Sequence, residues 1–304
     1  MKIALILIAL TVFISCNSEE VQKGDTEFIP EINNPNFATG AGPVVLIDEG
    51  HNNYHTMDGR YKPFAETLRR DGYSVRPHSG AFSTASLDEG DILVIANALP
   101  PDEGEDEAWS SLSPAFTPDE IQILVDWVRG GGSLFLVADH MPFPAVAADL
   151  ALALGFEFNN GYAIDTIASG PTVFTRKDNT LHAHLITDGQ SEENRISAVA
   201  SFTGQAFRAT IAVDTILSMP SSTGNYTPEE EEEFDRAKMT FEPVGGWLQG
   251  AVCEVGQGRL AVFGEAAMFT AQTHGTHKFG MSHPDGRQNL QFLRNLMLWL
   301  ADKN

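Results

Sequence analysis

Runs of apolar residues alternate with amphipathic stretches along the first half of the chain, in the order expected of β–α–β units. Continuous apolar runs at residues 43–48, 91–96 and 133–138 are typical of strands that are buried on both faces of a parallel sheet. Between the first two runs, residues 61–70 carry apolar side chains at helical spacing, and residues 73–75 form a shorter extended pattern. This alternation predicts an α/β fold with a mostly parallel, doubly wound sheet.

One helix has an unusually clear beginning and end. Thr117 is a candidate N-cap, Pro118 occupies the first helical position, and Glu120 completes a capping box. The helical pattern that follows stops at a glycine run that begins at Gly130, as expected of a C-terminus. A further helix is predicted over residues 145–154.

The pattern loosens between residues 160 and 245, where short apolar stretches predict a β-rich insertion. These stretches are centred on Phe174 and Ile186 and on residues 196–202 and 215–219. Beyond the insertion, the pattern predicts a β-hairpin with strands at residues 248–255 and 260–264. It also predicts a C-terminal helix over residues 288–301. The acidic, proline-rich stretch 100–114 predicts a loop.

The N-terminus has the pattern of an export signal. Lys2 precedes an apolar run over residues 3–14, which is shorter than the ~20 residues of a membrane-spanning helix but fits the core of a signal peptide. The run ends at Phe13-Ile14-Ser15-Cys16, which resembles the lipobox of bacterial lipoproteins, although Phe13 stands where Leu is usual. The resemblance implies cleavage before Cys16 and a lipid on its sulfur. A plain secretory signal and a retained membrane anchor are the alternatives.

We therefore divide the chain into three parts. Residues 1–15 are the signal peptide, residues 16–42 are the lipidated cysteine and a flexible tether, and residues 43–304 are a single α/β domain with an insertion at about 160–245. Residues 17–20 resemble the acidic tag that takes some lipoproteins to the cell surface, and otherwise begin a solvated linker. The expected location is the bacterial envelope, with the lipid in the outer membrane and the domain exposed at the surface.

The charge of the chain restricts its partners. A formal net charge of −22 repels nucleic acid and anionic head groups, and it attracts divalent cations or cationic ligands. Solubility alone is the simpler explanation of this charge. Since Cys16 carries the lipid, Cys253 has no partner for an intramolecular disulfide, and its alternating surroundings predict a buried structural thiol.

Polar side chains follow three of the predicted strands. In open α/β sheets, ligands bind beyond the carboxyl ends of the strands, so these side chains are expected to converge on one pocket. They are Asp48, Glu49, His51, Asn52, Asn53 and His55 after the first strand, Asp139 and His140 after the fourth, Glu265 after a late strand, and Gln272 and His274 in the loop beyond it.

Imidazole and carboxylate groups together indicate a divalent metal such as Zn, Mn or Fe. The candidate metal ligands are Asp48, His51, His55, Asp139 and His140. A bound ion would make hydroxide available for hydrolysis, with Glu49 or Glu265 as the candidate general base. The remaining candidates for ligand binding are Asn52, Asn53, Gln272 and His274.

Each of these residues also has a structural interpretation. Asp48 and Asp139 can cap the turn that follows a strand, and His51 can satisfy loop amides. His140 can pack within its loop, and His274 can lie in solvent. The spacing is not a recognised metal signature, so the site hypothesis depends on convergence at one edge of the sheet.

Five blocks of sequence, at residues 44–51, 91–95, 116–137, 256–265 and 289–300, resemble one known group. It is an uncharacterised bacterial domain family of the class I glutamine-amidotransferase-like superfamily, related to domains of gliding-motility and auxiliary transport proteins. The similarity covers residues 43–160 and 246–301 and implies a flavodoxin-like, three-layer fold. Enzymes of the superfamily carry a cysteine in a Gly-x-Cys-x-Gly elbow. The comparable position here reads VADHM, so amidotransferase activity is not implied.

Two functions remain open. The first is an envelope-anchored hydrolase of a glycan, peptide or amide, dependent on a divalent metal. The second is a non-catalytic ligand-binding or assembly subunit of an envelope complex of the gliding or transport type. The expected partners are the membrane, through the lipid on Cys16, a small-molecule or glycan ligand, and envelope proteins.

Overall fold

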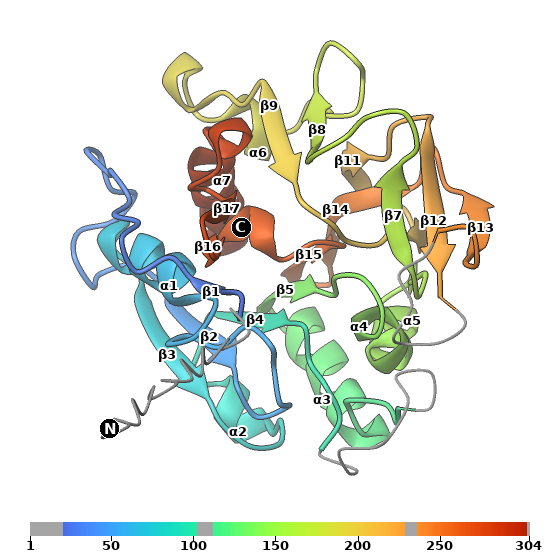
Figure 1. Cartoon of the computed structure of the whole chain (residues 1–304). Coiled ribbons are helices and arrows are strands. Elements are labelled where there is room, and N and C mark those ends of the chain that lie inside the picture. The colour runs from blue at the N-terminus through green and yellow to red at the C-terminus, as the bar shows by residue number, and fades with distance from the viewer. Residues whose placement is uncertain (1–20, 102–111, 229–235, 303–304) are drawn as a thin grey trace, which may run out of the picture.

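The computed structural model describes residues 21–101, 112–228 and 236–302. Within these residues the largest sheet has seven strands, in the spatial order β11-β14-β15-β5-β4-β2-β3 (Figure 1). Strands β15, β5, β4, β2 and β3 run parallel, and β14 and β11 extend the sheet antiparallel. The bounds are β2 Val44–Asp48, β3 Ser74–His78, β4 Ile92–Ala96, β5 Ser133–Val137, β11 Asp214–Ser218, β14 Leu248–Val255 and β15 Gly258–Phe263.

The parallel strands are arranged in the order 2-1-3-4-5 when numbered along the chain, which is the order of flavodoxin-like sheets. The chain passes from β2 outward to β3 and then returns to β4 on the other side of β2. The order therefore reverses between β2 and β4. Ligands of open α/β sheets bind at such a reversal, beyond the carboxyl ends of the strands.

Helices cover both faces of this sheet. Helices α1 and α7 pack with one set of strand residues, which includes Val45 and Phe135, and α2, α3 and α5 pack with the alternate set, which includes Leu46 and Leu134. The result is a three-layer α/β fold with two apolar cores. The bounds are α1 Lys62–Arg70, α2 Thr84–Leu87, α3 Pro118–Arg129, α4 Phe143–Val146, α5 Ala148–Ala153, α6 Leu185–Asp188 and α7 Asn289–Ala301.

Smaller antiparallel sheets surround the main one. The described insertion contributes β7-β12-β13 and β8-β9, and its strand β10 pairs with β6, which precedes the insertion. A further sheet, β1-β16-β17, joins the N-terminal segment to the chain after β15. Their bounds are β1 Lys23–Gly24, β6 Phe156–Glu157, β7 Tyr162–Asp165, β8 Thr172–Thr175, β9 Ala198–Ser201, β10 Arg208–Ala209, β12 Thr223–Thr227, β13 Thr240–Pro243, β16 Ala271–His274 and β17 His277–Gly280.

The described part of the expected flexible tether, residues 21–42, lies on the domain. Strand β1 pairs with β16, and the backbone N–H of Asp25 donates to the carbonyl of Ala271 at 2.8 Å. Phe28 and Phe37 pack against the core of the α1 and α7 face. A glycine- and proline-rich composition indicated flexibility, but these two aromatic side chains give the segment apolar surface to bury.

Several local predictions are confirmed. The capping box at Thr117 and Glu120 is formed, and α3 ends at Gly130. The predicted hairpin is β14–β15, with Gly256 in the left-handed region at φ 64°. Cys253 is buried, and burial together with the charge of Asp214 raises the pKa of its thiol to about 11.

Three local predictions differ from the structure. The helix predicted over residues 145–154 is divided at Ala147 into α4 and α5. Ile186 lies in the short helix α6, because the His184 side chain accepts the N–H of Ile186 and caps that turn. The stretch after Glu265 is the β16–β17 hairpin rather than a loop.

Some predictions fall on residues that the structure does not describe. Residues 1–20, which include Cys16, and most of the loop at 100–114 lie outside the described ranges. Among the described residues, no helix combines the length and the apolar character needed to cross a membrane.

Candidate functional site

A small polar cavity lies beyond the carboxyl ends of β4 and β5, beside the point where the strand order reverses. Its volume is about 70 Å³. The loop after β2, the β16–β17 hairpin and the N-terminal segment complete its wall. The polar side chains that line it are Gln22, Tyr54, His55, Arg60, Asn97, Asp139, His140, Thr203 and Gln272.

Asn97 follows β4 directly and connects three loops. Its backbone has φ 57°, in the left-handed region that Asn tolerates better than most residues. Its Oδ1 accepts the backbone N–H of Asp139 at 2.9 Å, and its Nδ2 lies 3.2 Å from His55 Nδ1. Its carbonyl accepts the N–H of Tyr54 at 2.9 Å. The loops after β2 and β5 are therefore both held by the end of β4.

His55 is a buried, neutral ring between two amides. Because Asn97 Nδ2 donates to Nδ1, the ring hydrogen lies on Nε2, 3.1 Å from the Gln272 amide. The Gln272 atom nearest to it is Nε2, and Gln272 Oε1 accepts from Gln22 Nε2 at 2.6 Å, so an acceptor for the His55 Nε2–H requires that both amides be turned together. Burial, with the charges of Arg60 and His140, lowers the pKa of His55 to about 3. The cavity thus presents an uncharged imidazole at all ordinary pH values.

Asp139 and Glu265 form a pair of carboxyl groups, of which only Asp139 lines the cavity. Asp139 accepts the N–H of His140 at 2.8 Å and that of Ala266 at 3.0 Å. Glu265 is fully buried and accepts the N–H groups of Ala267 and Met268. Burial and the nearby charge of Asp139 raise the pKa of Glu265 well above its usual value. Burial and the Asp139 charge thus both favour the protonated form of Glu265.

His140 is the basic group that the cavity offers. Its Nδ1 lies 2.7 Å from the carbonyl of Met141, so Nδ1 carries the hydrogen and Nε2 keeps its lone pair. Its ring stacks on Tyr162 at 4.5 Å with an interplanar angle of 19°. Within the described parts of the chain, no hydrogen bond is made to Nε2. A half-buried imidazole with a free lone pair can accept a proton from a bound ligand.

Arg60 and Gln22 form one side of the rim. The Arg60 Nε–H donates to the carbonyl of Gln22 at 3.1 Å, and its guanidinium lies 3.8 Å above the Tyr54 ring. The side-chain amides of Gln22 and Gln272 hydrogen-bond at 2.6 Å. The N-terminal segment thus contributes directly to the wall of the cavity.

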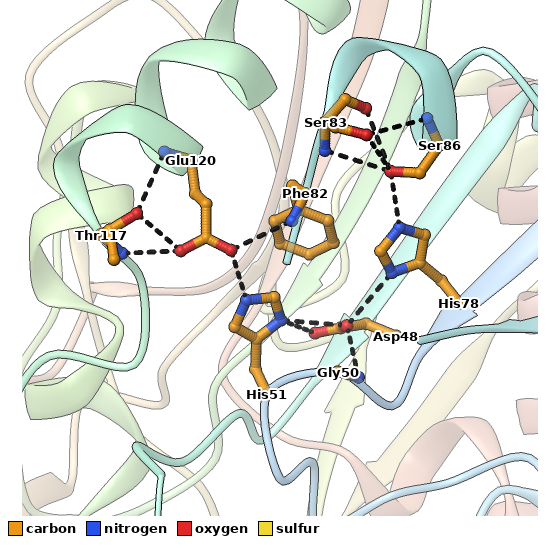
Figure 2. A network of polar contacts seen from close by, with 9 residues as sticks. All are labelled: Asp48, Gly50, His51, His78, Phe82, Ser83, Ser86, Thr117 and Glu120. Atoms are coloured by element: carbon orange, nitrogen blue, oxygen red, sulfur yellow. Dashed lines mark hydrogen bonds and ion pairs between the residues drawn. The ribbon is translucent and has the colours of Figure 1, made fainter. Parts of the chain in front are cut away.

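A second polar cluster surrounds His51 (Figure 2), and none of its residues lines the cavity. His51 Nδ1 lies 3.0 and 3.1 Å from the two carboxylate oxygens of Asp48, and Nε2 lies 3.0 Å from Glu120 Oε1. The ring is packed between Phe82 and Phe116, with centroid distances of 4.4 and 4.8 Å. This cluster joins the end of β2 to the first turn of α3.

The electrostatics of the cluster fit a buried imidazolium between two carboxylates. Burial alone would lower the pKa of His51, but the hydrogen bonds and charges of Asp48 and Glu120 raise it. Burial likewise opposes ionisation of the two acids, and hydrogen bonds from His51 and other donors nevertheless lower both pKa values, that of Glu120 to about 2. His78 extends the cluster, 3.8 Å from Asp48 and 3.0 Å from the Ser86 hydroxyl.

The five residues predicted to bind one metal ion lie in two separate places. His55, Asp139 and His140 line the cavity, whereas Asp48 and His51 bind each other and Glu120. Both nitrogens of His51 face carboxylates, so the ring has no lone pair for a metal. Among the described residues, no group of three or more His, Cys, Asp or Glu side chains is arranged to hold a metal ion.

The other predicted residues are dispersed. Glu49 accepts the backbone N–H of Met57, and neither it nor Glu265 lines the cavity, so the structure gives neither a general-base position there. Asn52 donates to the carbonyl of Pro100. Asn53 is buried, with both polar atoms of its side chain lacking a hydrogen bond, and His274 is exposed at the end of β16. Of the four ligand candidates, the cavity contains Gln272.

Sequence reasoning missed five of the polar residues that line the cavity, which are Gln22, Tyr54, Arg60, Asn97 and Thr203. Asn97 follows β4 in the same way as Asp139 follows β5, so the rule that identified Asp139 would also have found Asn97 if it had been applied to the strand at residues 91–96. Arg60 and Gln22 come from a helix-preceding loop and from the N-terminal segment, for which the pattern gave no signal. Glu120 was identified as a capping residue, but its contact with His51 spans 69 positions of sequence.

A larger groove lies at the opposite edge of the sheet. Its volume is about 900 Å³, and it is lined by the end of α3, including Trp127, and by the β14–β15 turn. It is widely open and contains none of the predicted site residues. The small cavity is the better candidate site because buried, mutually hydrogen-bonded side chains converge there.

Comparison with known proteins gives the fold alone. No family model matches the chain, and no curated protein matches it either. Among solved structures, "mmIFT52 N-terminal domain" has a TM-score of 0.61 at 13% identity and covers 86% of this chain and 98% of its own. "Cytoplasmic Protein STM3548 from Salmonella typhimurium" has a TM-score of 0.50 at 15% identity, covering 86% and 100%. A thua-like protein from Bacteroides uniformis has a TM-score of 0.44 at 12% identity, covering 91% and 96%.

Proposed function

We propose that this chain is an envelope-anchored ligand-binding lipoprotein, and that the cavity holds a small polar group of its ligand. The arrangement of His55, Asn97 and Gln272 carries this proposal, because three uncharged side chains are buried and held in position by one another. Polar groups that are already ordered fix the orientation of a ligand and reduce the entropic cost of binding.

The test is a thermal-shift screen on the Cys16→Ala chain with small sugars, amino acids, carboxylates and amides. A compound at about 100 times its Kd should raise the Tm by roughly 5 °C. Gln272→Met, which keeps the volume but removes the amide, should abolish the shift. The exposed Gln190→Met is the matched control and should retain it. Shifts that are equal in both variants, or absent throughout the screen, would exclude the cavity as the binding site.

Hydrolysis of a glycan, peptide or amide is the second candidate, favoured by one observation. His140 Nε2 keeps its lone pair at the cavity, next in sequence to the Asp139 carboxylate, so His140 can serve as a general base toward water. Turnover of a compound found in the screen, lost in His140→Gln while binding is retained, would establish the hydrolase. Unchanged turnover in that variant would refute this role.

The anchor and the finer fold assignment belong to the same proposal. The lipobox-like sequence ending at Cys16 supports attachment to the outer membrane, and the strand order supports a place in the class I glutamine-amidotransferase-like superfamily.

Fractionation of cells that produce the parent and the Cys16→Ala chain tests the anchor. The parent should remain with membranes and the variant should be released, and equal partition of the two would refute lipidation. An assembly subunit of an envelope complex is the alternative role for an anchored domain of this kind.

A further inference from the structure

A groove of about 580 Å³ lies next to the polar cavity, and we call it the aromatic groove. Phe202 and Phe279 line both spaces, so they form the boundary between them. Strand β17 contributes His277 and Lys278, and the segment beyond it contributes His283. The cavity and the groove therefore lie side by side and share this wall.

Half-buried rings give the groove flat apolar surfaces. The rings of Phe202 and Phe279 meet edge to face at 5.8 Å, and His283 meets Phe202 in the same way at 5.2 Å. His283 Nδ1 accepts the N–H of Asp285 at 3.1 Å, which leaves the ring hydrogen on Nε2 as a donor. Such surfaces stack against flat apolar faces, including the C–H face of a sugar ring.

The lining of the groove carries one permanent positive charge, on Lys278. Its ionisable lining residues are His277, Lys278 and His283, and no carboxylate is among the described residues that line it, although the net charge of the chain is −22. Two acids lie close by. Asp25, buried, is 3.7 Å from the Lys278 ammonium, and the half-exposed Asp285 is 3.7 Å from His283. The Lys278 side chain stays half exposed and can reach an anion.

We infer that the aromatic groove and the cavity together bind an acidic oligosaccharide, with a sugar ring on Phe202 and Phe279, its carboxylate toward Lys278, and hydroxyl groups in the cavity. This inference rests on the proposed function of the cavity. A sugar combines the three features that the two spaces complement: an apolar ring face, hydroxyl groups for the amides of Asn97 and Gln272, and an anionic substituent.

The experiment uses calorimetric titration of the Cys16→Ala chain with uronate trisaccharides of several linkages, each paired with its methyl ester. The ester keeps the ring and the hydroxyl groups and removes the charge. At least one acid should bind about tenfold more tightly than its ester, the ratio expected of one charge-assisted hydrogen bond. Lys278→Gln should reduce the ratio to near one, Phe279→Ala should weaken acid and ester alike, and the exposed Lys177→Gln should change neither.

The outcomes distinguish this inference from the proposal that the cavity binds a ligand, on which the inference rests. If small ligands bind in a Gln272-dependent way but no acid exceeds its ester, the acidic-sugar assignment is wrong and the cavity proposal stands. If Lys278→Gln leaves the ratio unchanged, the charge is recognised elsewhere and the assignment is again wrong. If neither trisaccharides nor small ligands depend on Gln272, both proposals fail.

Discussion

His51 contacts one carboxylate through each ring nitrogen, and both of its partners are buried with it. A buried ion group of this kind adds little net stability over an apolar substitute, but removal of one member leaves an uncompensated charge that costs about 3–5 kcal/mol. The cluster is therefore a structural connection between β2 and α3. It accounts for two residues that the sequence had assigned to a metal.

Stability should depend on pH through this cluster. The raised pKa of His51 means that its protonation stabilises the folded state. This stabilisation is fully present below the ordinary pKa of 6.5 and is lost as the pH rises through the raised value. The lowered pKa values of Asp48 and Glu120 mean that their ionised forms stabilise the folded state. This stabilisation is fully present above the ordinary pKa values of 3.8 for Asp48 and 4.5 for Glu120, and it is lost as the pH falls through the lowered values. The stabilisation by this cluster should be greatest between about pH 4.5 and 6.5.

Urea unfolding between pH 3 and pH 9 measures this dependence. The parent should be compared with His51→Gln, which keeps a polar side chain and removes the titrating ring. The difference in the free energy of unfolding between the two should decrease on the alkaline side, and a difference that stays constant with pH would contradict the assignment of an imidazolium.

Asn97 combines an unusual backbone with two side-chain contacts, and substitutions can separate these contributions. Asn97→Gly keeps the left-handed backbone without strain and loses both contacts, which should cost about 1–3 kcal/mol. Asn97→Ala loses the same contacts and adds strain of about 1 kcal/mol. Chemical denaturation should thus rank the parent above Gly and Gly above Ala. An Ala variant as stable as the Gly variant would show that the backbone is not constrained there.

At the scale of elements, α3 was predictable because its signals are local. Its cap, its first-turn proline and its terminal glycine all lie within one short stretch. The elements of the insertion were harder to predict, because their strands are short and pair at long range. Ile186 shows the reason: one apolar residue carries no period, and the helix around it depends on the His184 cap.

The first turn of α3 has two separable functions. Thr117→Ala removes the cap and should cost about 1 kcal/mol of unfolding free energy. Glu120→Ala removes the cap partner and also the carboxylate beside His51 and the acceptor of the Phe82 N–H, so it should cost about 3–5 kcal/mol. The exposed Asp119→Ala is the control, with an expected cost of about 0.3–1 kcal/mol. Equal losses for Thr117→Ala and Glu120→Ala would contradict a role for Glu120 beyond capping.

At the scale of the whole molecule, the alternation of strands and helices predicted the three layers and the edge at which polar residues gather. It could not predict which of them share a cavity, because that depends on how each loop turns after its strand. Asp48 pairs with His51, which contacts Glu120 of α3, whereas the backbone N–H of Asp139 donates to Asn97 at the cavity. The contribution of Gln22 depends on a pairing across about 250 positions, which no local pattern can reveal.

Removal of the N-terminal segment tests its place in the wall. A chain that begins at Glu27 loses β1 and the contacts of Gln22 and Asp25, and its Tm should fall by roughly 5–10 °C relative to a chain that begins at Val21. His55 should also become accessible, which mass spectrometry after diethyl pyrocarbonate treatment can measure. Unchanged modification of His55 would show that the segment does not cover the cavity.

The docking of the N-terminal segment also sets a distance. With Cys16 as the lipidated residue, only five residue steps separate the lipid from Val21, and a fully extended chain of that length reaches roughly 17 Å. A tether extending to residue 42 would have let the domain swing far from the bilayer. If Cys16 is lipidated as proposed, this short reach would keep the cavity close to the head-group layer and favour ligands presented at that surface, and residues inserted between Cys16 and Val21 should progressively release the domain.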